Sequence, residues 1–157
     1  MPTAPEPLLD GGRVILRLRS RERRLEALDR RSGERLGSVA VGTGPTNVVT
    51  DGENLAYVVD TANDGLLTVQ LRPDFEVTRR MHVPGAPYAV ALDRRRNRLW
   101  ITATATNELQ EAAAGPKPRP LRRFPTVRQP DRVAVEEATG RVVVTGRDGQ
   151  QRRLDAP

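Results

Sequence analysis

The chain has 157 residues, of which 37% are hydrophobic and only 3% aromatic, and its formal net charge is +6. This length allows one modest core, and no apolar run approaches the roughly 20 residues that would span a bilayer. There is no cysteine, which excludes disulfides, thiolate metal sites and a cysteine nucleophile. The interior must therefore be built from Val, Leu, Ile and Ala, which suits many small repeated units.

The first seven residues contain neither a basic segment nor an apolar stretch, so no signal peptide is visible. We expect a cytoplasmic protein by default, or an exported one if the chain is a fragment of a longer precursor. A degraded first repeat begins near Pro7, where the first strand is shortened. The alternation of Val14, Leu16 and Leu18 then predicts a half-buried strand.

Three further segments align with one another, and each begins with a proline. Pro45, Pro87 and Pro130 are 42 and 43 residues apart. Each proline precedes a short apolar strand, an acidic residue six positions later, a turn and a second apolar strand. A period of 40-odd residues with four strands is typical of a propeller blade. We predict a single all-β domain over 1–157, a partial or small β-propeller with blades of four antiparallel strands and about four repeats, at approximately 7–44, 45–86, 87–129 and 130–157.

Two segments depart from the regular pattern. Residues 108–114 form the best helical candidate, but they are few and occupy the third-strand position of their repeat, so a strand is predicted. Residues 112–123 interleave Gly115 and three prolines with basic residues. Because proline removes hydrogen-bond donors from a sheet, we expect a surface insertion or a ragged outer edge strand there. An extended segment that docks a partner is the alternative interpretation.

The residues from Leu28 to Gly42, followed by Gly44-Pro45 and then Leu55 to Asp60, resemble the YVTN-type β-propeller repeat. In that family an "ID-x-x-T-G-x" hairpin leads to "V-x-V-G-x-x-P", and a "V-A-V" strand is followed by "L-Y-V-x-N". The resemblance covers residues 25–103 and continues more weakly to the end. It implies a propeller fold, and it implies a binding or scaffolding module, often exported, or a relative of lactonase-like propellers.

The chain differs from the family pattern in two respects. The asparagine that closes "L-Y-V-x-N" is Asp60 in one repeat and aligns with Ala103 and Gly146 in the others. A ring of identical polar groups is therefore not expected. Complete family propellers have about seven blades, whereas four copies fit here. We favour an incomplete propeller whose open edges are covered by self-association. Ring closure by residues 3–9 and a truncated gene product are the alternatives.

No catalytic constellation is visible in the sequence. His82 is the only histidine and lies in a predicted outer strand, and no serine has the Gly-x-Ser-x-Gly context of a nucleophile, so a Ser-His-Asp triad is not expected. One histidine without any cysteine cannot assemble a zinc site. The run from Gly42 to Gly44 resembles the start of a phosphate loop, but no helix follows it, so a crossover between blades is predicted instead. We predict no catalytic residue, no resident metal and no cofactor.

The best candidate site is the face where the blade-to-blade crossovers meet the loops between second and third strands. Carboxylate and amide oxygens on this face could hold Ca²⁺, although Asx residues also cap tight turns without any ligand. Tyr57 and Trp100, at the same place in successive repeats, are predicted to pack between blades. The candidate ligand-binding residues are Thr46, Asn47, Asp60, Asn63, Asp64, Tyr88, Asn107, Asp131, Arg132 and Arg147.

The predicted function is a non-enzymatic binding or scaffold module that uses this loop face for a protein or small ligand. One alternative is a remnant or relative of a metal-dependent, lactonase-like propeller hydrolase. Another is nucleic-acid binding through an arginine-rich surface. The second alternative is not favoured, because Lys117 is the only lysine and an arginine excess is also produced by a GC-rich coding sequence. No membrane span is expected.

Overall fold

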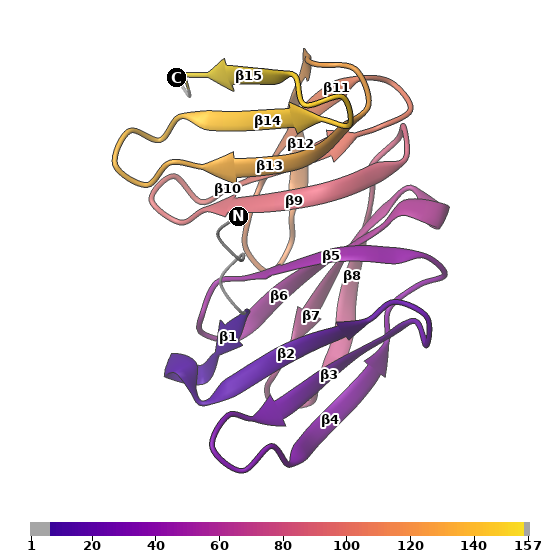
Figure 1. The fold of residues 1–157 in the computed structure, drawn as a ribbon. Coiled ribbons are helices and arrows are strands. Elements are labelled where there is room, and N and C mark those ends of the chain that lie inside the picture. The colour runs from indigo at the N-terminus through magenta and orange to yellow at the C-terminus, as the bar shows by residue number, and fades with distance from the viewer. Residues whose placement is uncertain (1–6, 156–157) are drawn as a thin grey trace.

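The structure, a computed structural model, describes residues 7–155. Four antiparallel sheets follow one another along the chain and are arranged in an arc (Figure 1). We call these sheets blades 1 to 4. Apart from two three-residue 3-10 turns, η1 (Asp10–Gly12) and η2 (Thr61–Asn63), the regular structure of the described residues is β-strand. The predicted all-β class, with antiparallel blades in about four repeats, is therefore confirmed.

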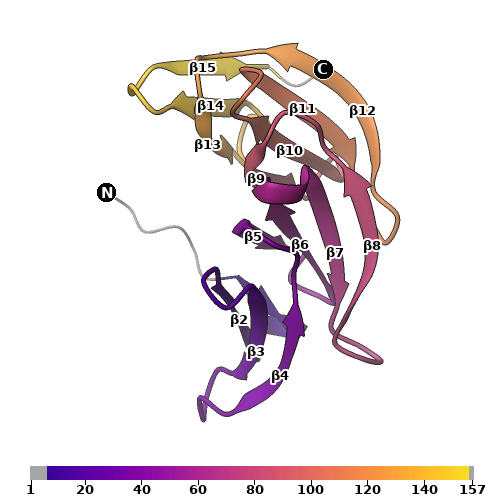
Figure 2. The same ribbon diagram turned by 90° about the vertical axis from the view of Figure 1, so that its right-hand side faces the viewer.

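Each blade is a meander in which consecutive strands are neighbours in the sheet. Figure 2 shows β5, β9 and β13 on the concave side of the arc, and β8 and β12 on its convex side. Blade 1 contains β1 (Leu8–Leu9), β2 (Val14–Arg19), β3 (Arg24–Asp29) and β4 (Arg35–Ala40). Blade 2 contains β5 (Pro45–Thr50), β6 (Leu55–Asp60), β7 (Gly65–Gln70) and β8 (Glu76–His82). Blade 3 contains β9 (Pro87–Asp93), β10 (Arg98–Ala103), β11 (Glu108–Ala113) and β12 (Arg119–Pro125), and blade 4 contains β13 (Pro130–Val135), β14 (Val142–Gly146) and β15 (Gln151–Leu154).

The repeated proline and the acidic residue six positions later mark the two ends of each inner strand. Proline is tolerated as the first residue of β5, β9 and β13 because a strand can begin without a backbone donor. At the far end, Asp93 Oδ1 accepts hydrogen bonds from the amides of Arg95 and Arg96, both at 3.1 Å. Asp51 Oδ1 likewise accepts hydrogen bonds from the amides of Glu53 and Asn54 in the turn that follows it. These short acidic side chains close the first hairpin of blades 2 and 3.

The core lies between the blades, in three separate clusters. Because successive strand residues point to opposite faces, blades 2 and 3 each bury one apolar face against the preceding blade and one against the next. Leu16 and Leu25 of blade 1 meet Val58 and Leu67 of blade 2. Ile101 of blade 3 belongs to the cluster shared with blade 2. The third cluster joins blade 3 to the valines of β14.

Tyr57 and Trp100 are buried in these interfaces, as their equivalent positions predicted. The Tyr57 hydroxyl donates to the Gly115 carbonyl at 3.0 Å and accepts from the Gly115 amide at 2.8 Å, which connects blade 2 to the β11–β12 loop. Burial raises the pKa of the Tyr57 phenol above its ordinary value of 10.0. Trp100 is fully buried, and its ring centroid lies 6.0 Å from that of Phe124.

The irregular segments also form strands. Residues 108–113 form β11 rather than a helix, and β12 is the exposed outer edge strand of blade 3, with a register shift opposite Ala112. His82 is exposed at the end of β8. Of the segment considered for ring closure, residues 3–6 lie outside the described residues, and Leu8–Leu9 pair with β2. Between residues 7 and 155 no helix is long and apolar enough to cross a bilayer.

Candidate functional site

The loop that joins the second and third strands of blades 2 and 3 ends in an Asx residue with left-handed backbone. Asp64 has φ 48° and Asn107 has φ 56°, a region that Asp and Asn tolerate better than most residues. Asp64 Oδ1 accepts from the amide of Ala86 at 3.0 Å, and Asn107 Oδ1 accepts from the amide of Gln129 at 2.8 Å. Both amides immediately precede the first proline of the next blade. Each Asx side chain therefore fixes a connection between blades.

The connection between blades 1 and 2 is held in a different way. The corresponding loop residue of blade 1 is Arg23, with φ 58°, and its side chain has no acceptor. The buried Asp60 carboxylate at the end of β6 instead accepts from the amides of Thr43 at 3.1 Å and Gly44 at 2.8 Å. Asn63 Nδ2 donates to the same carboxylate at 3.1 Å. Asp60 thus supplies, from blade 2, the acceptor that blade 1 lacks.

Threonine side chains add hydrogen bonds between successive blades, on the same face of the arc as these connections. Thr46 Oγ1 donates to the Tyr88 carbonyl at 2.7 Å and lies 2.9 Å from Thr61 Oγ1. Thr61 Oγ1 donates at 2.6 Å to the carbonyl of the first proline of blade 3. Thr104 Oγ1 makes the equivalent bond to the first proline of blade 4 at 2.9 Å. These side chains join the blades, so several of them are not free for a ligand.

The remaining predicted site residues take part in fewer contacts. Asn47 is half-buried on β5, whereas Arg132 and Arg147 are exposed. Asp131 is also half-buried, and within residues 7–155 its Oδ1 atom is buried without a hydrogen-bond partner. The structure therefore brings the ten predicted residues to the face of the arc that carries the crossovers between blades. The principal carboxylate and amide acceptors there are already bonded to backbone amides.

A cleft of about 810 Å³ lies along the inner strands, beside the turns that follow them and away from the crossovers between blades. Its volume falls in the range of ligand clefts, roughly 300–1,000 Å³. Residues of all four blades line it, and none of the ten predicted site residues does. Half-buried apolar side chains form its floor, and exposed charged residues border it. The floor residues are Leu8, Val48, Val49, Leu92 and Val135, and the border residues are Glu53, Arg94, Arg95 and Glu137.

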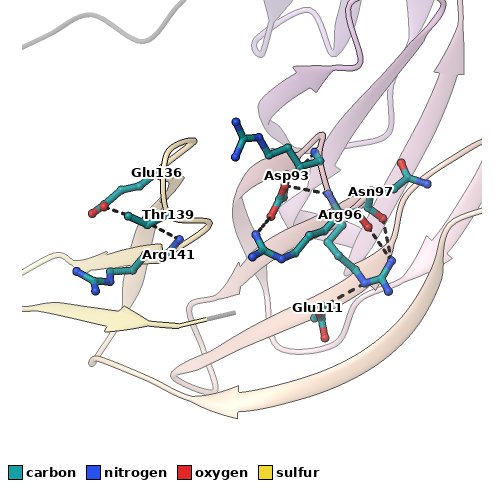
Figure 3. Close-up of polar contacts among 9 residues, drawn as sticks. Asp93, Arg96, Asn97, Glu111, Glu136, Thr139 and Arg141 are labelled. Atoms are coloured by element: carbon teal, nitrogen blue, oxygen red, sulfur yellow. Dashed lines mark hydrogen bonds and ion pairs between the residues drawn. The ribbon is translucent and has the colours of Figure 1, made fainter. Parts of the chain in front are cut away.

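The turns at the mouth of the cleft are held by ion pairs and short polar bonds (Figure 3). Asp93, which is 4% exposed, pairs through Oδ2 with Arg96 Nη1 at 3.1 Å. The Arg96 guanidinium also occupies the place that a Cβ on Gly140 would need, so it fits against the turn of blade 4. Thr139 Oγ1 donates to Glu136 Oε2 at 3.2 Å in that turn. Of these contacts, the approach of Arg96 to Gly140 brings the turns of blades 3 and 4 together beside the cleft.

Among residues 7–155 the charged groups near the cleft do not form an acid–base pair or a nucleophile with its base. The Asp93 carboxylate is used by backbone amides and by Arg96, and His82 lies on the convex side on β8. Among the described residues no three His, Cys, Asp or Glu side chains form a group that could hold a metal ion. The geometry of the cleft is suited to binding: an apolar floor for contact area, and a charged border for orientation.

Sequence reasoning missed the cleft because it favoured polar loop residues. The floor residues come from β1, β5, β9 and β13, which the sequence predicts as inner strands of the blades and not as a binding surface. Val48, Leu92 and Val135 are only half-buried, although strands in the interior of a closed ring would be covered. The sequence does contain a signal for the border of the cleft. The acidic residue six positions after each proline marks a hairpin turn, and Arg94 and Arg95 directly follow the one at Asp93.

Comparisons with solved structures place the fold in a known class. Hydrazine synthase of Kuenenia stuttgartiensis superposes with a TM-score of 0.81 at 15% identity, covering 96% of this chain and 45% of that chain. A chain of the mitotic checkpoint complex gives a TM-score of 0.80 at 9% identity, covering 93% and 48% respectively. Dihydro-heme d1 dehydrogenase NirN in complex with DHE gives 0.77 at 15% identity, covering 98% and 34%.

These similar structures are β-propeller proteins, and the fold of this chain is that of a β-propeller. The chain spans less than half the length of each of these three solved chains. Identities of this size show the fold alone. No protein-family model matches the chain, and no curated protein matches it.

Proposed function

We propose that this chain is a YVTN-type propeller module that binds a partner in the cleft along its inner strands, without catalysing a reaction. The observation that carries the proposal is the cleft itself, to which all four blades contribute half-buried apolar side chains. The family assignment rests on the hairpin from Leu28 to Gly42 and on the strand from Leu55 to Asp60. Propellers host many functions, so the site and not the fold supports binding.

The position of the site differs from the loop face that the sequence favoured. Asp60, Asp64 and Asn107 accept bonds from the connections between blades. Their substitution would therefore disturb the packing of the blades together with any ligand. The cleft floor is a better target, since Leu92 and Val135 line the cleft and lie at the margin of the core clusters, and neither holds a connection between blades by a side-chain hydrogen bond.

The proposal is tested with immobilised protein and matched substitutions. Proteins that are captured from a cell extract by the wild-type chain should be lost with Leu92→Glu and with the near-isosteric Val135→Thr. The same proteins should be retained by Leu121→Glu, because Leu121 is exposed on the convex strand β12. Circular dichroism melting must show that all variants are folded. Equal capture by the cleft variants and the control would contradict the proposed site.

The hydrolase alternative has a separate test. Binding of Ca²⁺ to the native state would raise the melting temperature by mass action. The carboxylates of Asp60 and Asp64 are occupied by backbone amides, so we expect no shift at millimolar Ca²⁺. A clear rise in melting temperature would favour the metal-dependent alternative over simple binding.

A further inference from the structure

The sheet face of blade 1 that points away from blade 2 differs from the corresponding faces of blades 2 and 3. The second and third strands of blades 1, 2 and 3 are each joined by four residues, so their positions correspond one to one. Arg17 stands where blades 2 and 3 have Val58 and Ile101, which pack against the preceding blade. Glu26 stands where blade 2 has the buried Leu67. Two of the positions that join one blade to the previous one are therefore charged in blade 1, whereas Ile15 and Leu28 on the same face are apolar.

We call this surface the blade 1 end face. Four of its side chains are arginines, and with the single carboxylate of Glu26 they give a net charge of +3. Arg19 and Arg35 approach Glu26 at 3.8 and 3.9 Å, which are loose contacts. Within the described residues Arg17 makes no ion pair or side-chain hydrogen bond. The face comprises Ile15, Arg17 and Arg19 of β2, Arg24, Glu26 and Leu28 of β3, and Arg35 and Ser38 of β4.

The opposite end of the arc is also basic. On blade 4 the face that points away from blade 3 has Val143 where blades 2 and 3 have Tyr57 and Trp100, and it carries Arg132 and also Arg153, which lies 4.0 Å from Glu136. A head-to-tail contact between two copies would bring these arginines toward those of the blade 1 end face. Like charges at close range are unfavourable, and neither face offers the apolar surface of the internal interfaces. Self-association through the open ends is therefore disfavoured.

We propose that the blade 1 end face docks an acidic polypeptide segment. Arginine pairs with carboxylates through two parallel hydrogen bonds, and Arg17 and Arg35 are exposed and able to do so. The half-buried Ile15 and buried Leu28 alternate with these arginines across the face. An extended segment directs every second side chain to the same side, so acidic residues at alternate positions would all face these arginines. The buried Glu26 carboxylate at the centre of the face repels carboxylates and phosphates alike, so the test below includes a nucleic-acid probe.

The test uses fluorescence anisotropy with three labelled probes: a peptide of alternating Glu and Val, the same peptide with Lys for Glu, and single-stranded oligo-dT. We expect the acidic peptide to bind at low salt and to dissociate as salt is raised, because the contacts are ionic. The double variant R17S/R35S should bind it about tenfold more weakly. The control R79S/R80S, which removes two exposed arginines from the outer strand β8, should bind it as the wild type does.

A second variant gives an effect of the opposite sign. Glu26→Gln removes the central negative charge and frees Arg19 and Arg35, so the acidic peptide should bind more tightly. Equal weakening in R17S/R35S and in the β8 control would overturn the proposal, as would weaker binding by Glu26→Gln. Tighter binding of oligo-dT than of the acidic peptide would assign the face to nucleic acid instead. A concentration-dependent dimer in light scattering that R17S/R35S disrupts would assign it to a second copy.

Discussion

At the scale of single residues, backbone geometry is as informative as side-chain chemistry in this protein. Gly42 has φ 83°, and a Cβ at this position would overlap the Asp60 carboxylate that holds the connection between blades 1 and 2. The glycine is thus required both by its conformation and by the close approach of a buried charge. Gly33 has a similar φ of 76°, but no atom lies within 4 Å of the position of its missing Cβ.

The pair Gly42 and Gly33 gives a direct test of this interpretation. Gly42→Ala should lower the free energy of unfolding by about 2–4 kcal/mol, because strain and overlap are combined. Gly33→Ala should cost only about 1 kcal/mol, the cost of left-handed backbone alone. Urea denaturation followed by circular dichroism measures both values. Equal losses would mean that the Asp60 contact does not constrain Gly42.

A second residue-scale prediction concerns pH. Arg72 Nη2 donates to Asp10 Oδ2 at 2.6 Å, and this bond holds the pKa of Asp10 below its ordinary 3.8. A carboxylate with a depressed folded-state pKa adds stability above the unfolded-state pKa, and that stability is lost as the pH falls through the folded-state value. Melting temperature should therefore fall less steeply below about pH 3.8 in Asp10→Asn than in the wild type. Parallel pH profiles of the two proteins would refute the role of this pair.

At the scale of elements, the crossovers between blades follow one rule with one exception. In blades 2 and 3 the loop after the second strand supplies the acceptor, through Asp64 and Asn107. In blade 1 that position is Arg23, and Asp60 of the next blade takes over. This exchange explains why Asp60 aligns with Ala103 in blade 3, where no such carboxylate is needed. A residue that breaks the repeat can therefore be structural.

The exchange predicts a rescue experiment. Asp60→Ala leaves the Thr43 and Gly44 amides without their acceptor and should cost about 2–4 kcal/mol of stability. Adding Arg23→Asn restores an acceptor at the position that Asp64 and Asn107 occupy, and should recover about 1 kcal/mol. Arg23→Ala in the same background is the control and should recover nothing. The three variants are compared by urea denaturation, and the idea fails if alanine rescues as well as asparagine does.

At the scale of the whole molecule, stability is distributed among interfaces that have no cluster residues in common. The first apolar cluster joins blades 1 and 2, the second joins blades 2 and 3, and the third joins blades 3 and 4. Such stacked units behave as a sum of blade and nearest-neighbour terms. Both ends of the arc are charged, so the apolar surface is concentrated between the blades and along the cleft.

This arrangement predicts where substitutions add. Val58→Ala and Ile101→Ala lie in different clusters, and each should cost about 2–3 kcal/mol. Because they share no cluster, the double variant should show the sum within about 0.5 kcal/mol. Val58 and Leu67 face each other across β6 and β7, so the double variant Val58→Ala/Leu67→Ala should depart from the sum of its single variants by more than about 0.5 kcal/mol. Denaturant unfolding of the five variants decides between these outcomes.

The repeat, and with it the class of fold, could be predicted from the sequence. Prolines at 45, 87 and 130 begin the inner strands, and the alternating valines and leucines give the faces that pack between blades. These signals are local, because period-two alternation and turn residues act within one hairpin. For the same reason the strand at residues 108–113 and the packing roles of Tyr57 and Trp100 could be predicted.

Which residues are available for binding could be learned only from the tertiary structure. Asp60 and Asn107 have the same chemistry whether they hold a ligand or a backbone amide, and the sequence does not say which amide comes within 3 Å. The cleft exists because half-covered side chains of four blades meet across the concave side of an arc, and that meeting depends on the angle between blades. Local patterns fix strands, whereas the contacts between residues distant in sequence fix the site.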